Sequence, residues 1–172
     1  MKIFLIGLPG SGKSTLGKKL ALTMKLPFVD LDDEIERAEG MSIPTLFKLK
    51  KEDYFRKVES SLLMQWCERE DDFVMATGGG APVFLDNLSH MNKSGITVFL
   101  DVPAAEIARR VAASGRNDRP LLAKADAEAM KDQVEFMRSQ RIRHYLQATH
   151  SIKGTAISAD EIIQLIKMGT RP

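Results

Sequence analysis

The stretch "GLPGSGKST" at residues 7–15 decides the fold class, because it matches the pattern G-x-x-x-x-G-K-[ST]. An apolar run precedes it at residues 2–6, and apolar residues at helical spacing follow at residues 13–24. A glycine-rich loop that leads into a helix N-terminus presents its backbone N–H groups to anionic phosphates. The stretch therefore predicts a phosphate-binding loop (P-loop), in which Lys13 reaches the β- and γ-phosphates and Ser14 ligates Mg²⁺.

A P-loop predicts a triphosphate site without identifying the reaction, since GTPases, motor ATPases and small-molecule kinases share it. The base-reading signature N-K-x-D of G proteins is absent, because "NKSG" at residues 92–95 breaks it at the last position. A chain of 172 residues leaves room for a nucleotide core and one small pocket. The residues that we expect to contact ATP are Gly10, Ser11, Gly12, Lys13, Ser14 and Thr15.

Short apolar runs alternate with longer helical patterns along the rest of the chain. Strands are predicted at residues 2–6, 27–31, 73–77, 97–102 and 150–154. Helices are predicted at residues 13–24, 53–69, 103–113, 126–147 and 158–169, with a further helix ending at Gly40. This alternation predicts one α/β domain over residues 1–172 with a parallel sheet. The aperiodic segment at about 112–125 is a candidate lid.

Composition narrows the partners. The 25 basic and 23 acidic residues leave a net charge of +2, which gives no support to nucleic-acid binding. The single cysteine, Cys67, excludes a disulfide framework and a cysteine-based zinc site. The apolar N-terminus is too short for a membrane span and lacks a signal-peptide cleavage site, so we expect a cytoplasmic location.

Carboxylates cluster where the second predicted strand ends. Asp30 and Asp32 lie two residues apart in "FVDLDDEIE" and share a side of an extended segment. Ligands bind at the carboxyl ends of strands in open α/β sheets, so one carboxylate is expected to order Mg²⁺ waters and the other to meet an acceptor hydroxyl. An alternative is that Asp32 or Asp33 caps the helix ending at Gly40.

Several arginines are candidates for binding anions. Arg56 in "YFRKVE" lies near the core-facing side of its helix, with Glu59 on the same face, and either snorkels to the surface or directs its guanidinium at a carboxylate. Arg116 and Arg119 lie on the candidate lid, where they either close over phosphates or stay solvated. The run at 138–145 is either a solvated basic face or supplies one inward arginine.

A second glycine-rich stretch, "TGGGAP" at residues 77–82, has no lysine and no Ser or Thr after its glycines. It ends a predicted strand. Glycine costs backbone entropy, so three in a row at Gly78, Gly79 and Gly80 indicate a second bare-backbone surface that something approaches closely. A close strand–helix crossing that needs no Cβ atom is the alternative.

Taken together, these motifs resemble the shikimate kinase family over nearly the whole chain. The resemblance is carried by "GLPGSGKSTLGKKLA", "FVDLDDEIE", "FRKVE", "TGGGAP", "RPLL" and "RIRHY", in the family's order. It implies a P-loop kinase fold with a central five-stranded parallel sheet, strand order 2-3-1-4-5, flanked by helices. It also implies a monomer that uses ATP and Mg²⁺ to phosphorylate the 3-hydroxyl of shikimate, on the route to aromatic amino acids.

The resemblance implies a role for each candidate residue. Lys13, Asp32 and Arg119 would be catalytic, Ser14 and Asp30 would hold the metal, and Arg110 would lie against the adenine. Shikimate would contact Asp32, Arg56, Gly78, Gly79, Gly80 and Arg141, with Glu59 holding Arg56 and a helical segment at about 32–62 forming much of the pocket. No nucleic acid or membrane is implied.

The chain departs from the family pattern at several positions. Lys51 stands where a glycine is usual, Ala76 where a hydroxyl residue is frequent, and Arg143 where the family has proline. The segment between Arg110 and Arg119 is slightly long, which leaves open whether Arg116 or Arg119 is the main lid arginine. Another small-molecule kinase, such as a gluconate or nucleotide kinase, and a non-catalytic P-loop binding module remain as alternative functions.

Overall fold

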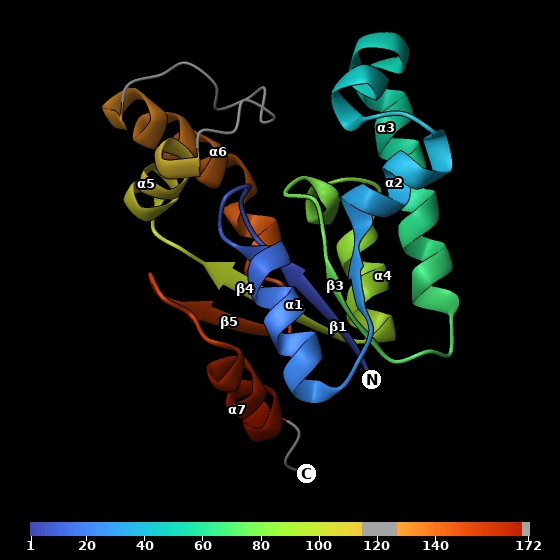
Figure 1. Ribbon diagram of the computed structural model, residues 1–172, viewed down its shortest axis with the longest axis vertical. Coiled ribbons are helices and arrows are strands. Elements are labelled where there is room, and N and C mark those ends of the chain that lie inside the picture. The colour runs from blue at the N-terminus through green and yellow to red at the C-terminus, as the bar shows by residue number, and fades with distance from the viewer. Residues whose placement is uncertain (115–126, 170–172) are drawn as a thin grey trace.

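A computed structural model describes residues 1–114 and 127–169 of the chain. Its centre is a five-stranded sheet with the order β2-β3-β1-β4-β5, in which every neighbouring pair is parallel (Figure 1). The strands are β1 Lys2–Ile6, β2 Phe28–Asp30, β3 Phe73–Ala76, β4 Ile96–Asp101 and β5 His150–Lys153. The predicted fold class and strand order are confirmed.

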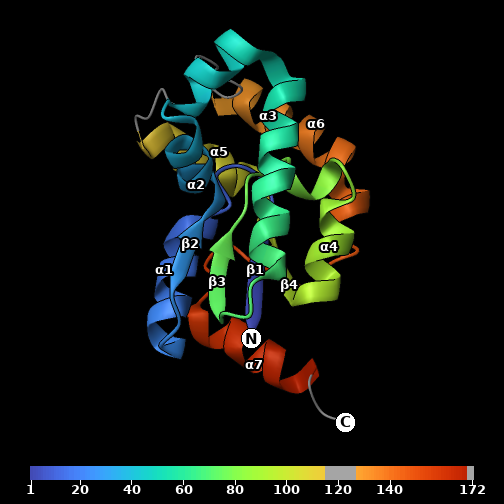
Figure 2. The same cartoon turned by 90° about the vertical axis from the view of Figure 1, so that its right-hand side faces the viewer.

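Helices cover both faces of this sheet. They are α1 Lys13–Met24, α2 Leu31–Glu39, α3 Ile43–Glu68, α4 Asn87–Ser94, α5 Ala104–Ser114, α6 Ala127–Tyr145 and α7 Ala159–Gly169, with a short 3₁₀ turn η1 at Ala81–Val83. Alternating residues of β1 explain the two layers. Ile3 and Leu5 pack toward α1 and α7, whereas Phe4 and Ile6 pack toward α3, α4 and α6 (Figure 2).

The helix boundaries differ from the sequence-based ones in places. The helix predicted at 53–69 begins at Ile43, because Ser42 accepts a hydrogen bond from the Thr45 backbone N–H and caps an earlier start. Helix α4 follows η1 and was not predicted. The capping box that opens α7 is confirmed, since Ser158 and Glu161 exchange side-chain to backbone hydrogen bonds.

Lys51 interrupts α3 with φ 69° and ψ 172°, so helical geometry holds on either side of it but not at it. Glycine adopts this region readily, whereas residues that carry a Cβ atom rarely do. The interruption falls at the position where the resemblance implies a glycine. It separates the outer part of α3, which reaches the core through Leu46, from the part that packs against the core through Phe55 and Leu63.

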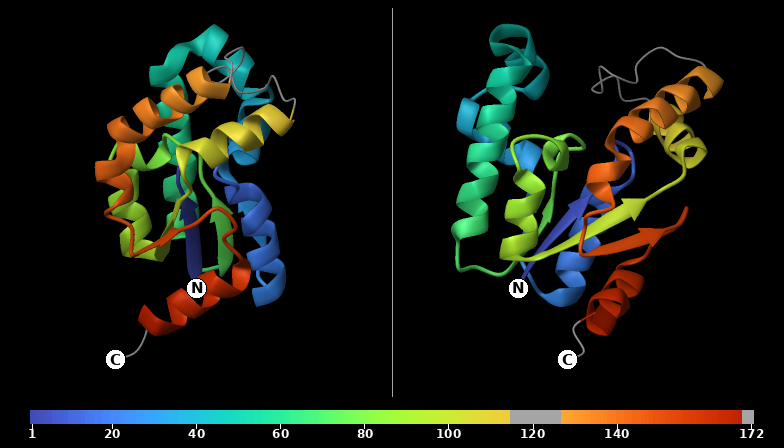
Figure 3. Two further views of the ribbon diagram at one scale, coloured as in Figure 1. Left: turned by 90° about the vertical axis from the view of Figure 1, so that its left-hand side faces the viewer. Right: turned by 180° about the vertical axis from the view of Figure 1, so that it is seen from behind.

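The sheet order brings two loops together at one edge. Leu5 of β1 pairs with Ala76 of β3, and both the N–H and the hydroxyl of Thr77 donate to the Leu5 carbonyl. The P-loop after β1 and the glycines after β3 therefore leave the sheet side by side. Helices α2 and α3 stand on one side of these strand ends, and α5 and α6 stand on the other (Figure 3).

Candidate active site

The P-loop holds its lysine inward in the described state. Lys13 is only 8% exposed, and its Nζ donates to the carbonyls of Gly7 and Leu8, each at 2.9 Å. Gly12 caps α1 with φ 94°, a left-handed conformation that suits glycine. The loop backbone is therefore shaped around a cationic side chain at the N-terminus of α1, which favours an anionic ligand.

Arg110 joins three segments next to this loop. Its Nε donates to Glu106 at 2.7 Å, Nη1 donates to the Ser11 carbonyl at 3.0 Å, and Nη2 donates to the Thr155 carbonyl. Hydrogen bonds from Arg109 and then from Arg110 lower the pKa of Glu106 to about 2. Arg110 thus lines a cavity of about 400 Å³, together with Gly12, Thr15, Lys19, Val102 and Ile157 among others. This cavity is the size of a pocket for a small organic group.

Two side chains whose oxygen atoms could bind a metal ion, Ser14 and Asp30, contact each other next to the P-loop. The Ser14 hydroxyl donates to Asp30 Oδ2 at 2.6 Å. The other Asp30 oxygen accepts from the Asp32 backbone N–H at 3.1 Å, so Asp30 is the N-cap of α2. The alternative that Asp32 or Asp33 caps this helix is wrong, because the strand ends at Asp30, one residue earlier than expected, and the helix begins at Leu31.

Asp32 and Glu59 converge on Gly78 from different helices. A Cβ atom added at Gly78 would lie 2.9 Å from Glu59 Oε1 and 3.1 Å from Asp32 Oδ1. Burial, reinforced by the charge of Asp30, raises the pKa of Asp32 to about 6. Burial also raises the pKa of Glu59 to about 7, against the opposing pull of Arg56. Both carboxyls therefore change charge close to neutral pH.

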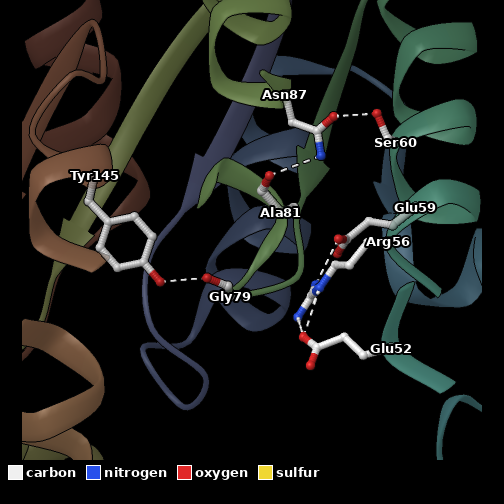
Figure 4. Close-up of polar contacts among 8 residues, drawn as sticks. All are labelled: Glu52, Arg56, Glu59, Ser60, Gly79, Ala81, Asn87 and Tyr145. Atoms are coloured by element: carbon white, nitrogen blue, oxygen red, sulfur yellow. Dashed lines mark hydrogen bonds and ion pairs between the residues drawn. The ribbon is translucent and has the colours of Figure 1, made fainter. Parts of the chain in front are cut away.

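Arg56 is held by acidic residues of its own helix (Figure 4). Nη1 donates to Glu59 Oε2 at 2.8 Å, while Nε and Nη2 donate to Glu52 Oε1 at 3.2 and 3.1 Å. The guanidinium also lies over the ring of Phe84, 4.3 Å from its centroid. With 13% of its side chain exposed, Arg56 does not snorkel to the surface. Its planar cation lies against Gly80.

Protein atoms fill the space that side chains at Gly79 and Gly80 would need. A Cβ at Gly79 would lie 2.6 Å from Cδ of Pro9 in the P-loop, and one at Gly80 would lie 2.6 Å from both terminal nitrogens of Arg56. The Tyr145 hydroxyl donates to the Gly79 carbonyl at 2.5 Å, and Figure 4 shows this contact reaching across from α6. Neighbouring atoms of Pro9 and of Arg56 therefore leave no room for a Cβ atom at either position.

The basic run on α6 has several environments. Arg138 pairs with Asp101 at the end of β4, with 3.0 Å between Nη2 and Oδ1, so it is not part of a solvated face. Burial raises the pKa of Tyr145 to about 12, and the neighbouring Arg141 opposes that rise. Arg141 also acts electrostatically on Glu59. Arg141 thus faces the acceptor side of the site, whereas Arg143 is exposed.

The structure brings most of the predicted site residues together at the carboxyl ends of β1, β2 and β3. Arg116 and Arg119, together with most of the predicted lid, lie outside the described residues, while residues 112–114 belong to α5. Contacts that sequence reasoning missed are those of Glu52 with Arg56 and of Tyr145 with Gly79. The contact of Glu52 with Arg56 could have been predicted from their i, i+4 spacing on a helix. The contact of Tyr145 with Gly79 joins residues 66 apart in the chain, and no sequence pattern indicates it.

The described residues offer a partial site for a metal ion. Within residues 1–114 and 127–169 no group of three or more His, Cys, Asp or Glu side chains is arranged to hold a metal ion. Ser14 and Asp30 supply two oxygens next to the P-loop, which suits a hard cation such as Mg²⁺ that takes its remaining ligands from phosphate and water. The helices of this part of the chain are also too short or too polar to cross a membrane.

Comparison with known proteins points to one family. The family model described as shikimate kinase matches residues 9–168. The chain is 41% identical over 163 residues to a shikimate kinase of Phocaeicola vulgatus, covering 95% of this chain and 92% of the relative. It is 36% identical over 165 residues to one of Clostridium botulinum, covering 96% and 94%.

Solved structures agree. A shikimate kinase from Bacteroides thetaiotaomicron superposes with a TM-score of 0.88 at 33% identity, covering 98% of this chain and 97% of that one. One from Acinetobacter baumannii in complex with shikimate gives 0.87 at 32% identity, covering 99% and 95%. A gluconokinase from Sinorhizobium meliloti, at 17% identity and a TM-score of 0.56, shares the fold alone.

Proposed function

The chain belongs to the shikimate kinase family, and we propose that its residues divide phosphoryl transfer from ATP to shikimate between two adjoining pockets. It is an ATP-dependent phosphotransferase with shikimate as the alcohol acceptor. We assign the accepting oxygen to the 3-hydroxyl. That oxygen bonds to the γ-phosphorus, the bond from the γ-phosphorus to the β–γ bridging oxygen breaks, and the products are shikimate 3-phosphate and ADP.

The donor pocket is the P-loop with its neighbours. Residues 10–15 cradle the phosphates of ATP, and Lys13 leaves the Gly7 and Leu8 carbonyls to meet the transferring phosphoryl group. Ser14 and Asp30 would hold Mg²⁺, Ser14 directly and Asp30 through water, and the ion would neutralise phosphate charge. Arg110 lines the cavity in which the adenine binds.

The acceptor pocket is formed by α2, α3, α6 and the glycines after β3. Arg56 and Arg141 pair with the shikimate carboxylate, and Glu59 keeps Arg56 in orientation. Asp32, with its pKa near 6, is ionised at pH 7 and takes the proton that the 3-hydroxyl loses. Main-chain groups at Gly78, Gly79 and Gly80 form the floor beneath the ring. The helical segment at about 32–62 thus supplies most of the acceptor site.

Arg119 is proposed to complete the site from the lid, with Arg116 as the competing candidate. An arginine there would stabilise charge on the transferring group, and the closed lid would exclude water that otherwise hydrolyses ATP. Replacing each arginine by alanine and comparing kcat identifies which of the two acts. The one whose loss lowers kcat by about 100-fold or more is the lid arginine.

The observation that carries the proposal is the register of β1 with β3, which brings the P-loop beside the cluster of Asp32, Glu59 and Arg56. An assay of ADP release tests it. We expect shikimate to stimulate release strongly, with no stimulation by gluconate or by nucleoside monophosphates. A rate independent of shikimate would contradict the proposed reaction, and stimulation by another acceptor would reassign its substrate.

Arg141→Ala tests the acceptor side of the proposal. We expect the KM for shikimate to rise by about tenfold or more while the KM for ATP stays within about twofold. Arg143→Ala is the matched control, because it removes the same charge from an exposed position two residues away on α6. Equal effects of Arg141→Ala on both KM values would refute the carboxylate contact.

We further infer a monomeric enzyme that requires Mg²⁺ and acts in the cytoplasm. The oxygen donors of Ser14 and Asp30 support the choice of metal. Sedimentation velocity tests the oligomeric state. Titration of chelated enzyme with Mg²⁺ tests the metal, and a rate that is unaffected by chelation would refute it.

A further inference from the structure

A buried polar link joins α3 to the glycine loop at residues 78–81. Ser60 Oγ donates to Asn87 Oδ1 at 2.7 Å, and Asn87 Nδ2 donates to the Ala81 carbonyl at 3.0 Å. Figure 4 shows the three residues in a row, from α3 through the start of α4 to η1. Ser60 and Asn87 are 7% and 0% exposed, so water does not substitute for these bonds.

The two ends of this link adjoin the acceptor pocket. Ser60 directly follows Glu59 and lies one helical turn beyond Arg56, so the same face of α3 carries all three. Ala81 directly follows Gly80, and its N–H donates to the Gly78 carbonyl at 3.1 Å. The link therefore ties the helix that bears the arginine clamp to the loop that forms the pocket floor.

The two residues before Asn87 have an uncommon backbone conformation. Leu85 and Asp86 both have positive φ, at 50° and 60°, which is uncommon outside glycine and costly for a bulky residue such as leucine. Strained backbone persists where the surrounding structure requires it, and it concentrates at functional sites. Here the Asn87 amide enters the core, and Asp86 makes no side-chain capping bond to α4.

The opposite side of the loop has its own anchor. Tyr145 donates to the Gly79 carbonyl from α6, while the guanidinium of Arg56 lies against Gly80. The glycines carry no side chains to hold them, so their position depends on bonds to their carbonyls. Without the Ser60–Asn87 link, the loop keeps the Tyr145 bond and the contact with Arg56 but loses this buried hydrogen-bonded tie to α3.

We propose that Ser60 and Asn87 are positioning residues for the acceptor site. Their hydrogen bonds set the distance between the Arg56–Glu59 pair and the floor at residues 78–80, and so determine how well the acceptor carboxylate and ring fit at once. A displacement of about 1 Å at such a site lowers the rate by up to about 100-fold. The proposal rests on shikimate being the acceptor.

Ser60→Ala is the first test, with Ser61→Ala as the matched control. Ser61 is the exposed neighbour on the same helix, so its variant makes the same chemical change away from the link. We expect Ser60→Ala to raise the KM for shikimate about tenfold, equivalent to about 1.4 kcal/mol, and to leave the KM for ATP within about twofold. Ser61→Ala should leave both values unchanged.

A double-mutant cycle then tests whether the two residues act together. We expect Asn87→Ala to raise the KM for shikimate at least as much as Ser60→Ala, and the double variant to be no worse than Asn87→Ala alone. Independent, multiplying effects would overturn the proposed link. So would a lowered melting temperature of Ser60→Ala with an unchanged KM for shikimate, since that pattern marks a purely structural role.

The wild-type protein in the same assay separates this proposal from the proposed function. If wild type shows no shikimate-dependent ADP release, the function itself has failed. If wild type turns over shikimate and Ser60→Ala matches it in both KM values, only the positioning role has failed.

Discussion

Arg56 binds only one of the two carboxylate oxygens of Glu59. Nη1 donates to Oε2 at 2.8 Å, whereas the buried Oε1 has no hydrogen-bond partner among the described residues and faces Gly78. A buried acceptor left unpaired costs free energy, and burial raises the pKa of Glu59 to about 7. The ion pair that orients Arg56 is therefore sensitive to pH in the physiological range.

We predict that kcat/KM for shikimate falls as the pH drops through about 7 and then 6. Protonation of Glu59 weakens its hold on Arg56, and protonation of Asp32 removes the base. Because the two carboxyls interact, the measured pKa values belong to the pair. Glu59→Gln should lower kcat/KM and leave a pH profile with a single decline on the acid side, near pH 6. Glu68→Gln, at an exposed position of α3, should keep the wild-type pH profile. Two separate declines in the profile of Glu59→Gln would contradict the assignment.

Asp32→Asn should stabilise the protein while abolishing turnover. The folded-state pKa of Asp32 is about 6 against an ordinary 3.8, so the folded protein binds more protons than the unfolded chain between about pH 4 and 6. Stability from this group is thus lost as the pH rises through that window. At pH 8 we expect Asp32→Asn to raise the free energy of unfolding by on the order of 2 kcal/mol, a figure reduced to allow for partial exposure. This corresponds to several degrees in melting temperature.

Differential scanning fluorimetry at pH 8 and pH 4 checks this expectation. The gain should shrink towards zero at pH 4, where the unfolded carboxyl also binds its proton. Asp33→Asn, one residue along and exposed, should change stability by less than about 0.5 kcal/mol. A destabilised Asp32→Asn at pH 8 would mean that the carboxylate is held favourably and not under strain.

Gly79→Ala and Gly80→Ala should weaken the binding of different substrates. At Gly79 the new Cβ meets the rigid ring of Pro9 in the P-loop, so we expect the KM for ATP to rise about tenfold. At Gly80 it meets the guanidinium of Arg56, so the KM for shikimate should rise instead. Initial-rate kinetics with each substrate varied in turn measures both values. If both variants affected the same substrate, the two added Cβ atoms would not act through the separate neighbours Pro9 and Arg56.

Lys51→Gly should stabilise the protein, because Lys51 holds a backbone conformation that glycine adopts without strain. We expect a gain of about 1 kcal/mol, or about 2–4 °C in melting temperature. Lys48→Gly is the matched control. It lies in regular helix on the same exposed side and should lose about 1 kcal/mol. A loss of stability in both variants would show that the Lys51 side chain matters more than its backbone.

The sheet and the donor site could be predicted from sequence because their signals are local. The P-loop pattern spans nine residues, and each strand is a short apolar run that needs no distant partner to be recognised. The early start of α3 was missed because its outer part is mostly exposed and lacks a continuous apolar stripe. Helix α4 was missed for a similar reason, since it is short and its first residue is a buried asparagine.

For the acceptor site, the residues that take part could be predicted from the sequence, but not how they contact one another. Ser60, Asn87 and Tyr145 act through partners on other elements, and such pairs leave no spacing signal. The N-cap of α2 could not be assigned because three aspartates lie within four positions, and the choice of Asp30 depends on where the strand stops. That choice leaves Asp32 free to face the pocket.

The pairing of Leu5 with Ala76 has a consequence for how acceptor preference can change. Adjacent strands are about 4.8 Å apart, and this spacing is fixed by main-chain hydrogen bonds that no side-chain substitution alters. The distance between the P-loop and the glycines after β3 is therefore set by the pairing of the strands. Substitutions on α3 and α6 can change which alcohol the enzyme accepts without changing the distance over which the phosphoryl group is transferred. The scaffold thus separates the choice of alcohol from the geometry of transfer.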